Sequence, residues 1–448
     1  MKLPEDFSKR MLLQLGPETF SKFKSSLEQT PPVSIRINPL KLNIQAELEK
    51  VPWCVNGYYL PSRPVFSSDP LWHAGAYYVQ EASSMMLEQA FLTARQAIKN
   101  PVKVLDLCAA PGGKSSHIAS MLDQHDVLVC NEVIKTRVPV LYENMVKQGY
   151  PNFIITNSDS SEFEHLGEIF DIILVDAPCS GEGLFRKDIN AMDEWNLENV
   201  STCEMRQKRI LDAVKKCLKP EGYLIYSTCT YNPGENEQQL ERLCSEGFMP
   251  VTFTLNGETN SRFQCYPHQI KGEGFYIALL QKQYTDHIEC KEAGKNKLKV
   301  FKPDHTLKSL IDSAAEFYEF EEHILVVPEV LMSFYSAHIS NLYCYAIGTK
   351  VGRIKDKNYY PSEYLPFSTL LERQAMPEID LNQAQALSYL ANNILPYQGR
   401  EKGYALLTYM GVPLGLGKFA GNRINNLFPN SWRLRKQTVS SEWFTLVK

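Results

Sequence analysis

The sequence predicts an α/β protein whose central part is a doubly wound, mainly parallel sheet. Between residues 102 and 228, five short apolar runs alternate with helical or loop segments. A turn of small residues follows the first run, and acidic residues end several of the others. Because sheets of this class bind ligands at the carboxyl ends of their strands, we expect the chemistry of the protein at these turns.

The composition is that of a folded intracellular protein. The 448 residues are 44% hydrophobic, which suffices for two to four domains, and the formal net charge is -4. The start of the chain has no apolar h-region, and no apolar run reaches the roughly 18 residues of a membrane span, so we expect a cytoplasmic protein without membrane contact. The 11 cysteines include no C-x-x-C pair. That pattern argues against a disulfide framework and predicts no metal site.

The amino-terminal 100 residues predict a small α+β extension. A helix over residues 5–29 should break at Gly16-Pro17. Alternation in residues 33–41 predicts a short strand that places Arg36 and Asn38 on one face.

The strands of the central sheet follow from the apolar runs. We expect them at residues 102–107, 127–132, 153–158, 171–176 and 223–228, with a further strand at 274–281. The Lys-rich stretch 282–298 is interpreted as a linker. Residues 299–390 predict a mixed α/β segment without a chemical motif, and Gly-rich β-patterning follows in residues 403–418.

The turn after the first strand, 108-CAAPGGK-114, is a candidate cofactor cradle. Its small residues let backbone N–H groups approach a ligand, and the helix that follows offers its positive end to a carboxylate. Glu132 stands where an acid typically binds ribose hydroxyls, and Asp159 could accept from an adenine amino group. Each acid alone has an ordinary strand-end explanation, but the ordered set, which Asp106 begins and Asp176 ends, predicts S-adenosylmethionine rather than a dinucleotide.

Two cysteines stand just past adjacent strands, Cys179 in 174-LVDAPCSGEG-183 and Cys229 in 226-YSTCTYNPGENE-237. Both sit in turns rich in Pro and Gly, so we expect both thiols to face one pocket beside the cofactor. A thiolate that adds to carbon 6 of a pyrimidine makes carbon 5 nucleophilic toward a methyl donor. Asp176 is placed to hydrogen-bond the ring, and Cys179 to assist the departure of the product. The predicted substrate is a single-stranded or flipped cytosine.

These motifs, together with residues 207–237 and 266-YPHQIKGEGFYIALLQ-281, resemble the RNA cytosine-5 methyltransferase family. The resemblance covers roughly residues 70–285 and implies a Rossmann-like S-adenosylmethionine-dependent core. It implies that Cys229 is the nucleophile, that Cys179 assists product release and that Asp176 lies at the base. The cofactor contacts that it implies are Cys108, Ala109, Ala110, Pro111, Gly112, Gly113, Lys114, Glu132, Arg137, Asp159 and Asp176.

The carboxyl-terminal residues 402–436 look like the PUA-type RNA-binding domain of the bacterial small-subunit rRNA (RsmF-type) branch of that family. We expect the basic residues near this end to contact RNA phosphates, and the aromatic residues among them to stack on bases or riboses. The basic set is Arg400, Lys402, Lys418, Arg423, Arg433, Arg435 and Lys436, and the aromatic set is Tyr404, Tyr409, Phe419, Phe428 and Trp432.

The expected organisation has four parts: an RNA-binding extension (1–100), a methyltransferase domain (101–285), a linker with a small α/β domain of unknown role (286–390) and a PUA-like domain (391–448). The expected partner is RNA, first of all 16S rRNA in the small ribosomal subunit, bound by a monomer. Two alternatives stay open: a tRNA enzyme of the same chemistry, and a non-catalytic RNA-binding assembly factor.

Overall fold

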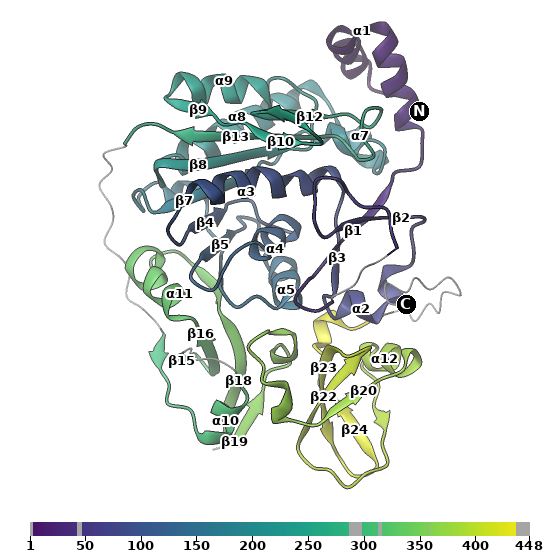
Figure 1. Cartoon of the computed structure of the whole chain (residues 1–448), viewed down its shortest axis with the longest axis vertical. Coiled ribbons are helices and arrows are strands. Elements are labelled where there is room, and N and C mark those ends of the chain that lie inside the picture. The colour runs from purple at the N-terminus through teal and green to yellow at the C-terminus, as the bar shows by residue number, and fades with distance from the viewer. Residues whose placement is uncertain (1–2, 43–46, 286–297, 312–315, 357, 436–448) are drawn as a thin grey trace.

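The computed structural model describes residues 3–42, 47–285, 298–311, 316–356 and 358–435 (Figure 1). Most of the predicted linker and the last residues of the tail, including Lys436, lie outside the described residues. The chain forms an amino-terminal unit, a large central sheet with its helices, and two smaller units below it in Figure 1.

The central sheet confirms the predicted doubly wound architecture. Its strand order is β12-β13-β8-β7-β4-β5-β6-β17, and β4 to β8 pair in parallel, whereas β12, β13 and β17 are antiparallel edge elements. All six predicted strands are present. Their bounds are β4 Lys103–Asp106, β5 Val127–Asn131, β6 Phe153–Thr156, β7 Phe170–Asp176, β8 Leu218–Thr228 and β13 Phe275–Lys282, with β12 at Arg262–Cys265 and β17 at Cys344–Ile347.

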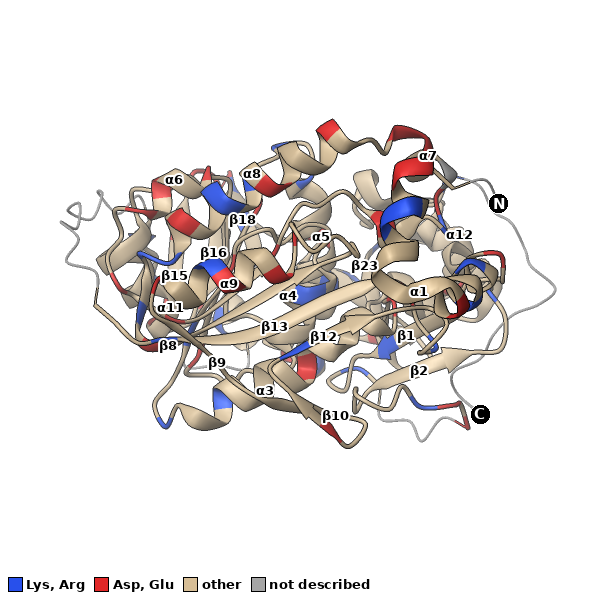
Figure 2. Ribbon diagram, turned by 90° about the horizontal axis from the view of Figure 1, so that it is seen from above, with Lys and Arg blue, Asp and Glu red and all other residues tan. Residues whose placement is uncertain are grey.

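Helices cover both faces of this sheet, as its continuous apolar strands require. On one face lie α3 (Leu87–Ala97), α4 (Gly113–Ala119) and α5 (Val138–Gln148). On the other lie α6 (Ser160–Phe163), α8 (Leu197–Val214), α9 (Glu237–Ser245) and α11 (Glu329–Phe334). Figure 2 shows charged residues on the outer helices α6, α8 and α9, whereas strand β13 between the layers is almost free of them.

The amino-terminal unit consists of α1 (Glu5–Leu27) and a three-stranded antiparallel sheet of β2 (Gly57–Leu60), β1 (Val33–Ile37) and β3 (Tyr77–Val79). The predicted break in the helix is confirmed, since Gly16 has φ 74° inside α1. The side chains of Arg36 and Asn38 are fully buried. Their polar groups are satisfied there, since Arg36 donates to the Ser116 hydroxyl and Asn38 donates to the Gln148 carbonyl.

The segment with no predicted motif forms a second sheet, β14-β15-β16-β18-β19. Its strands are β14 Lys299–Val300, β15 Glu316–Phe320, β16 His323–Val327, β18 Thr349–Lys355 and β19 Asn358–Pro361. It is not a separate domain, because β17, which lies between β16 and β18 in the chain, leaves this sheet and pairs with β6 of the central sheet.

The carboxyl-terminal unit is a sheet in the order β20-β22-β23-β24-β21 with helix α12 (Gln383–Leu390). Its strands are β20 Glu378–Asp380, β21 Leu395–Pro396, β22 Tyr404–Tyr409, β23 Val412–Phe419 and β24 Arg423–Asn426. This unit begins before the predicted boundary at residue 391, since β20 pairs in parallel with β22.

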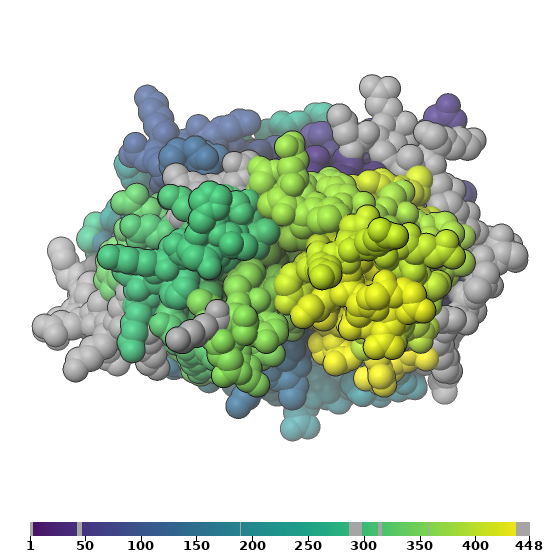
Figure 3. Space-filling view, turned by 90° about the horizontal axis from the view of Figure 1, so that it is seen from below, coloured from purple at the N-terminus to yellow at the C-terminus, as the bar shows by residue number. Residues whose placement is uncertain are grey.

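The aromatic residues of this unit correct the sequence interpretation. Tyr409, Phe419, Phe428 and Trp432 are buried in a core shared with the amino-terminal sheet, so they do not stack on RNA. Only Tyr404 is partly exposed, with Lys418 above its ring. Figure 3 shows the carboxyl-terminal unit beside the second sheet on one face of the molecule. Among the described residues, no helix has the length and apolar character that crossing a membrane requires.

Candidate active site

The structure brings the two predicted cysteines together. Strands β7 and β8 pair in parallel, with Asp176 opposite Ser227, so their carboxyl-terminal turns lie side by side. The sulfurs of Cys179 and Cys229 are 3.2 Å apart, and the Cys229 backbone N–H donates to the Cys179 sulfur at 3.3 Å. Both are free thiols of intermediate exposure, in contrast to the buried Cys130 and Cys217.

The contact between the sulfurs makes the two thiols chemically different. The hydrogen bond with Cys229, reinforced by burial, raises the pKa of the Cys179 thiol well above its usual range. Cys179 therefore keeps its proton and can donate it toward the neighbouring sulfur.

Asp176 is held beside the thiols by two donors. The Ser227 hydroxyl donates to its Oδ1 at 2.7 Å, and the Lys114 ammonium donates to its Oδ2 at 2.8 Å. Burial alone would lower the pKa of Lys114, but the charge and hydrogen bond of Asp176 raise it. The nearby Cys229 sulfur also raises the pKa of Lys114, so this side chain lies between the cofactor turn and the cysteine turns.

A buried carboxylate that the sequence interpretation missed ties the two cysteine turns together. Glu235 accepts from the Ser180 backbone N–H at 2.9 Å, from the Ser180 hydroxyl, and from Gln207 Nε2 at 2.9 Å. Ser180 follows Cys179 directly, and Glu235 lies six positions after Cys229 in 232-NPGENE-237. The sequence shows two acids in this run, Glu235 and Glu237. Their spacing does not indicate that Glu235 accepts hydrogen bonds from the turn that carries Cys179.

Helix α1 braces the same turns from outside. The buried Glu182 carboxylate accepts from Arg10 Nη2 at 2.6 Å, from Trp195 Nε1 at 3.0 Å and from the Tyr231 backbone N–H at 3.1 Å. Phe7 and Phe23 of α1 pack in the same apolar cluster as Tyr231, two residues after Cys229. The amino-terminal helix is thus part of the wall of the site, a role that its sequence does not reveal.

The cofactor turn is fixed by side chains from three directions. Arg137 Nη2 donates to the Ala110 carbonyl at 2.7 Å, and Asn144 Nδ2 donates to the Pro111 carbonyl at 2.7 Å. Arg36 Nη2 donates to the Ser116 hydroxyl at 2.8 Å from the amino-terminal sheet. Gly112 has φ 112°, a left-handed conformation that L side chains rarely adopt, which explains the glycine at this point of the turn.

The electrostatics of this turn favour a positively charged ligand. Burial raises the pKa of Asp106 to about 7, and its Oδ1 is buried without a partner among the described residues. Glu132 is buried and receives Arg137 Nη1 at 3.2 Å. Burial and the nearby carboxylates of Asp106, Asp176 and Glu132 raise the pKa of Cys108. An ammonium and a sulfonium, the two cations of S-adenosylmethionine, suit this set of acids.

Asp159 makes local contacts at the start of α6. Its Oδ1 accepts from the Ser161 backbone N–H at 3.1 Å and caps α6, and its Oδ2 lies 3.4 Å from Arg209. The cap lowers the pKa of Asp159. The hydroxyls of its two neighbours, Ser158 and Ser160, are buried without a partner among the described residues.

One buried cluster has the residue types of a metal site. Cys54, Glu88 and His117 hold their ligand atoms within 4.8 Å of one another beneath α4. His117 Nε2 is 2.9 Å from Glu88 Oε2, and Cys54 Sγ is 3.0 Å from the same oxygen. Burial and the nearby Arg36 lower the pKa of His117 to about 4. Glu88 thus contacts both of its neighbours, whereas Nδ1 of His117 is buried without a partner among the described residues.

Comparisons with known proteins agree with this geometry along most of the chain. The family model described as 16S rRNA methyltransferase RsmB/F matches residues 95–281. Models of the N-terminal domain of 16S rRNA methyltransferase RsmF and of the methyltransferase RsmF PUA domain match residues 3–82 and 376–434. The last range includes β20, in agreement with the sheet pairing.

Curated relatives and solved structures extend the likeness. Ribosomal RNA small subunit methyltransferase F of Vibrio cholerae serotype O1 (strain M66-2) is 30% identical, over 96% of this chain and 97% of the relative. The protein of the same name from Aliivibrio fischeri (strain MJ11) is 32% identical, over 88% and 90%.

Two structures from Pyrococcus horikoshii each cover 62% of this chain. The structure of NSun6 with SFG has a TM-score of 0.53 and 20% sequence identity, and the match covers 98% of that chain. The structure of a methyltransferase homolog protein has a TM-score of 0.50 and 27% sequence identity, and the match covers 100% of that chain. Identity, coverage and the matched domains together establish that the chain belongs to the 16S rRNA methyltransferase RsmB/F family.

Proposed function

We propose that the protein methylates carbon 5 of a specific cytosine in 16S rRNA, through a covalent bond between Cys229 and carbon 6 of the base. The observation that carries the proposal is the 3.2 Å contact between the two sulfurs, beside Asp176 and the acidic cofactor turn. Relatives that match most of the chain are named small-subunit rRNA methyltransferases, which favours rRNA over tRNA as the substrate.

The residues divide the reaction between them. The Cys229 thiolate attacks carbon 6, so a C–S bond forms while the electrons of the C5–C6 double bond move toward carbon 5 and N3. Asp176, fixed by Ser227 and Lys114, hydrogen-bonds the polar edge of the ring as charge develops there. Bound S-adenosylmethionine supplies an electrophilic methyl group.

Release of the product needs a second group. Once carbon 5 carries the new substituent, its proton leaves to a base, the C5–C6 double bond re-forms and the Cys229 sulfur is expelled as a thiolate. The protonated thiol of Cys179, which lies beside that sulfur, stabilises the departing thiolate by donating a hydrogen bond. Without this donor, the covalent adduct should persist.

For the cofactor, the proposed contacts are residues 108–114 with Asp106 and Glu132. The Asp106 carboxylate would hold the ammonium of the methionine part, and Glu132 the ribose hydroxyls. Arg137 then acts through Glu132 and the Ala110 carbonyl rather than on the ligand itself.

Bisulfite sequencing of rRNA and tRNA, from cells with and without the gene, tests the proposal and its alternatives. Loss of one methylated cytosine in 16S rRNA, restored by the intact gene but not by the Cys229→Ala variant, is the expected result. Loss of a tRNA methyl group instead would transfer the same chemistry to another substrate. An unchanged pattern in both RNAs would favour a non-catalytic assembly factor.

A further inference from the structure

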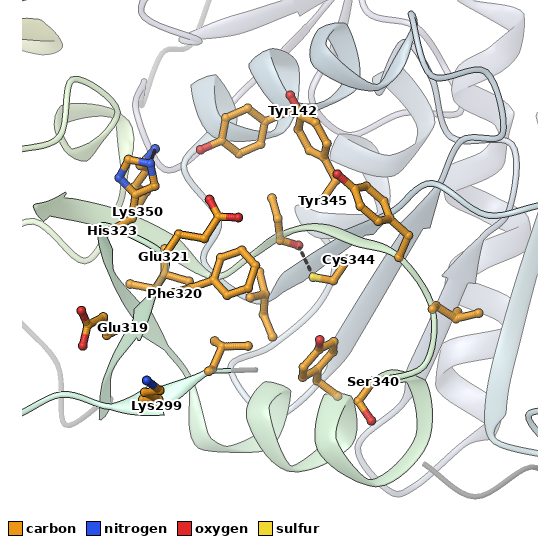
Figure 4. Close-up of a pocket in the computed structure, with 18 of the residues that line it drawn as sticks. Tyr142, Lys299, Glu319, Phe320, Glu321, His323, Ser340, Cys344, Tyr345 and Lys350 are labelled. Carbon is orange, nitrogen blue, oxygen red and sulfur yellow. Dashed lines mark hydrogen bonds between the residues drawn. The ribbon is translucent and has the colours of Figure 1, made fainter. Parts of the chain in front are cut away.

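A second cavity lies away from the thiols, at the β17 edge of the central sheet (Figure 4). It has a volume of about 730 Å³, within the range of about 300–1,000 Å³ that small-ligand sites have. Helix α5, strand β17 and the second sheet line it. Most of its lining thus comes from the segment whose sequence contains no chemical motif.

One wall of this cavity is aromatic. Tyr142 packs edge-on against Tyr345 and Tyr364, with ring centroids 5.8 Å and 5.4 Å away. Tyr345 is 39% exposed, although it stands in a strand of the central sheet. A tyrosine that is fixed by a partly buried neighbour and still exposes its ring offers a surface on which a nucleobase can stack.

The opposite side is polar. Lys350 Nζ donates to His323 Nε2 at 2.8 Å, so the histidine accepts there and carries its own proton on Nδ1. Burial lowers the pKa of both groups, and Lys350 further lowers the pKa of His323. Figure 4 shows Glu321 between this pair and the tyrosines. A cation, a neutral donor and a carboxylate acceptor therefore face the aromatic wall.

The cavity is connected to the cofactor side of the sheet but remote from the target base. The Asn157 backbone N–H donates to the Tyr343 carbonyl at 3.1 Å, and the Asn157 side chain donates to the Glu132 carbonyl at 2.6 Å. Strands β7, β4, β5 and β6 lie between β8 and β17. With strands about 4.8 Å apart, the cavity is about 24 Å from the thiols, which is several nucleotides along an RNA strand.

We propose that this cavity binds an unpaired nucleotide of the substrate RNA, several nucleotides away from the methylated cytosine, with its base on Tyr345 and its phosphate near Lys350. The proposal rests on the proposed function, because it takes RNA as the substrate. It assigns the second sheet a role in choosing the RNA, while the thiols and the cofactor turn carry out the reaction. Stacking on the tyrosine serves any base, and the donor and acceptor opposite it favour one base edge.

The test measures RNA affinity and turnover separately in the full-length protein. Tyr345→Ala and Lys350→Ala should each weaken binding of a single-stranded RNA of about 15 nucleotides by about ten-fold, the size that loss of one stacked base gives. Binding of an RNA of about four nucleotides around the target should stay unchanged, because it cannot reach the cavity. Turnover at saturating RNA should also be unchanged, and Tyr345→Phe should restore binding.

Two controls guard this interpretation. Tyr360→Ala and Lys355→Ala remove residues of the same types from the same sheet outside the cavity, and they should leave RNA affinity unaltered. Photo-crosslinking of the unmodified protein to the longer RNA carrying 4-thiouridine should label the peptide that contains Tyr345, whatever the stability of the variants.

Three outcomes would overturn the assignment. The first is full affinity for the longer RNA in both cavity variants, and the second is crosslinks confined to other parts of the chain. The third is a cavity that binds AMP while the affinity of the protein for the longer RNA stays the same. Each is distinct from failure of the proposed function, in which the unmodified protein would methylate no RNA although the binding measurements could still be made.

Discussion

At the scale of single residues, the site depends on a difference between two neighbouring thiols. The hydrogen bond with Cys229 raises the pKa of Cys179, which suits the proposed roles of Cys179 as the proton donor and Cys229 as the nucleophile. Asp176 has a fixed orientation because two donors hold it.

Replacing Cys229 by Ala should abolish methyl transfer and leave S-adenosylmethionine affinity unchanged, since the cofactor turn does not depend on that sulfur. Turnover of labelled cofactor and calorimetric binding measure the two quantities. Cys203→Ala, which removes a thiol of similar exposure outside the turns, should keep full activity. Residual turnover by the Cys229 variant would exclude the covalent route.

Glu235→Gln should lower kcat by about 10- to 100-fold, because the Ser180 turn loses its charged acceptor and Cys179 shifts relative to the base. KM for the cofactor should not change, since Glu235 does not contact its turn. Steady-state kinetics separates the two parameters, with the exposed Glu241→Gln as the matched control. A rise in KM alone would assign Glu235 to ligand binding.

Cofactor affinity should increase with pH. Burial raises the pKa of Asp106 to about 7, so the carboxyl is mostly neutral at pH 6 and mostly ionised at pH 8. A cationic ligand prefers the ionised form, and the dissociation constant should fall by up to about ten-fold over this interval. Calorimetry at several pH values measures the trend, and Asp106→Asn should flatten it. A flat profile in the unmodified protein would remove Asp106 from ligand binding.

At the scale of elements, α1 stabilises the turns that carry the cysteines. Its Arg10 meets Glu182, whose side chain is fully buried. Glu182→Ala removes that carboxylate and leaves Trp195 Nε1 and the Tyr231 N–H without their acceptor, so the variant should be less stable by about 3–5 kcal/mol. Denaturant unfolding measures the loss, and Glu198→Ala in an exposed turn of α8 should have almost none. An equal stability for both variants would mean that α1 is not coupled to the core.

The elements also show which features the sequence could predict. Periodicity and turn residues located every parallel strand, and the strand order placed Cys179 beside Cys229 as expected. Glu235 and Glu182 were missed, because each joins segments far apart in the chain, and the contact of Arg36 with Ser116 could not be predicted for the same reason. The stacking role of Phe419, Phe428 and Trp432 was wrong, because their burial depends on packing against the amino-terminal sheet, which spacing within residues 402–436 does not encode.

At the scale of the molecule, the amino-terminal sheet and the carboxyl-terminal unit share one apolar core, against which Val146 of α5 also packs. The exposed basic residues of the carboxyl-terminal unit are the contacts that we propose for the phosphates of the RNA. Lys402, Lys418 and Arg423 are exposed in the described part of this unit.

The triple replacement of Lys402, Lys418 and Arg423 by Ala should weaken RNA binding equally for different sequences and reduce the slope of log affinity against log salt by about 2–3, because three phosphate contacts are lost. Fluorescence anisotropy over a range of salt concentrations gives the slope. Replacing the exposed acid Glu401 by Gln should not reduce it. An unchanged slope in the triple variant would assign these residues to solubility.

The most direct test of the account is mass spectrometry of the Cys179→Ala variant after incubation with 16S rRNA and S-adenosylmethionine. We expect a nucleotide attached to the peptide that contains Cys229, and none in the Cys179→Ala, Cys229→Ala double variant. Normal turnover without an adduct, or a nucleotide attached to a different residue, would contradict the assignment of Cys229 as the nucleophile and of Cys179 as the group that releases it.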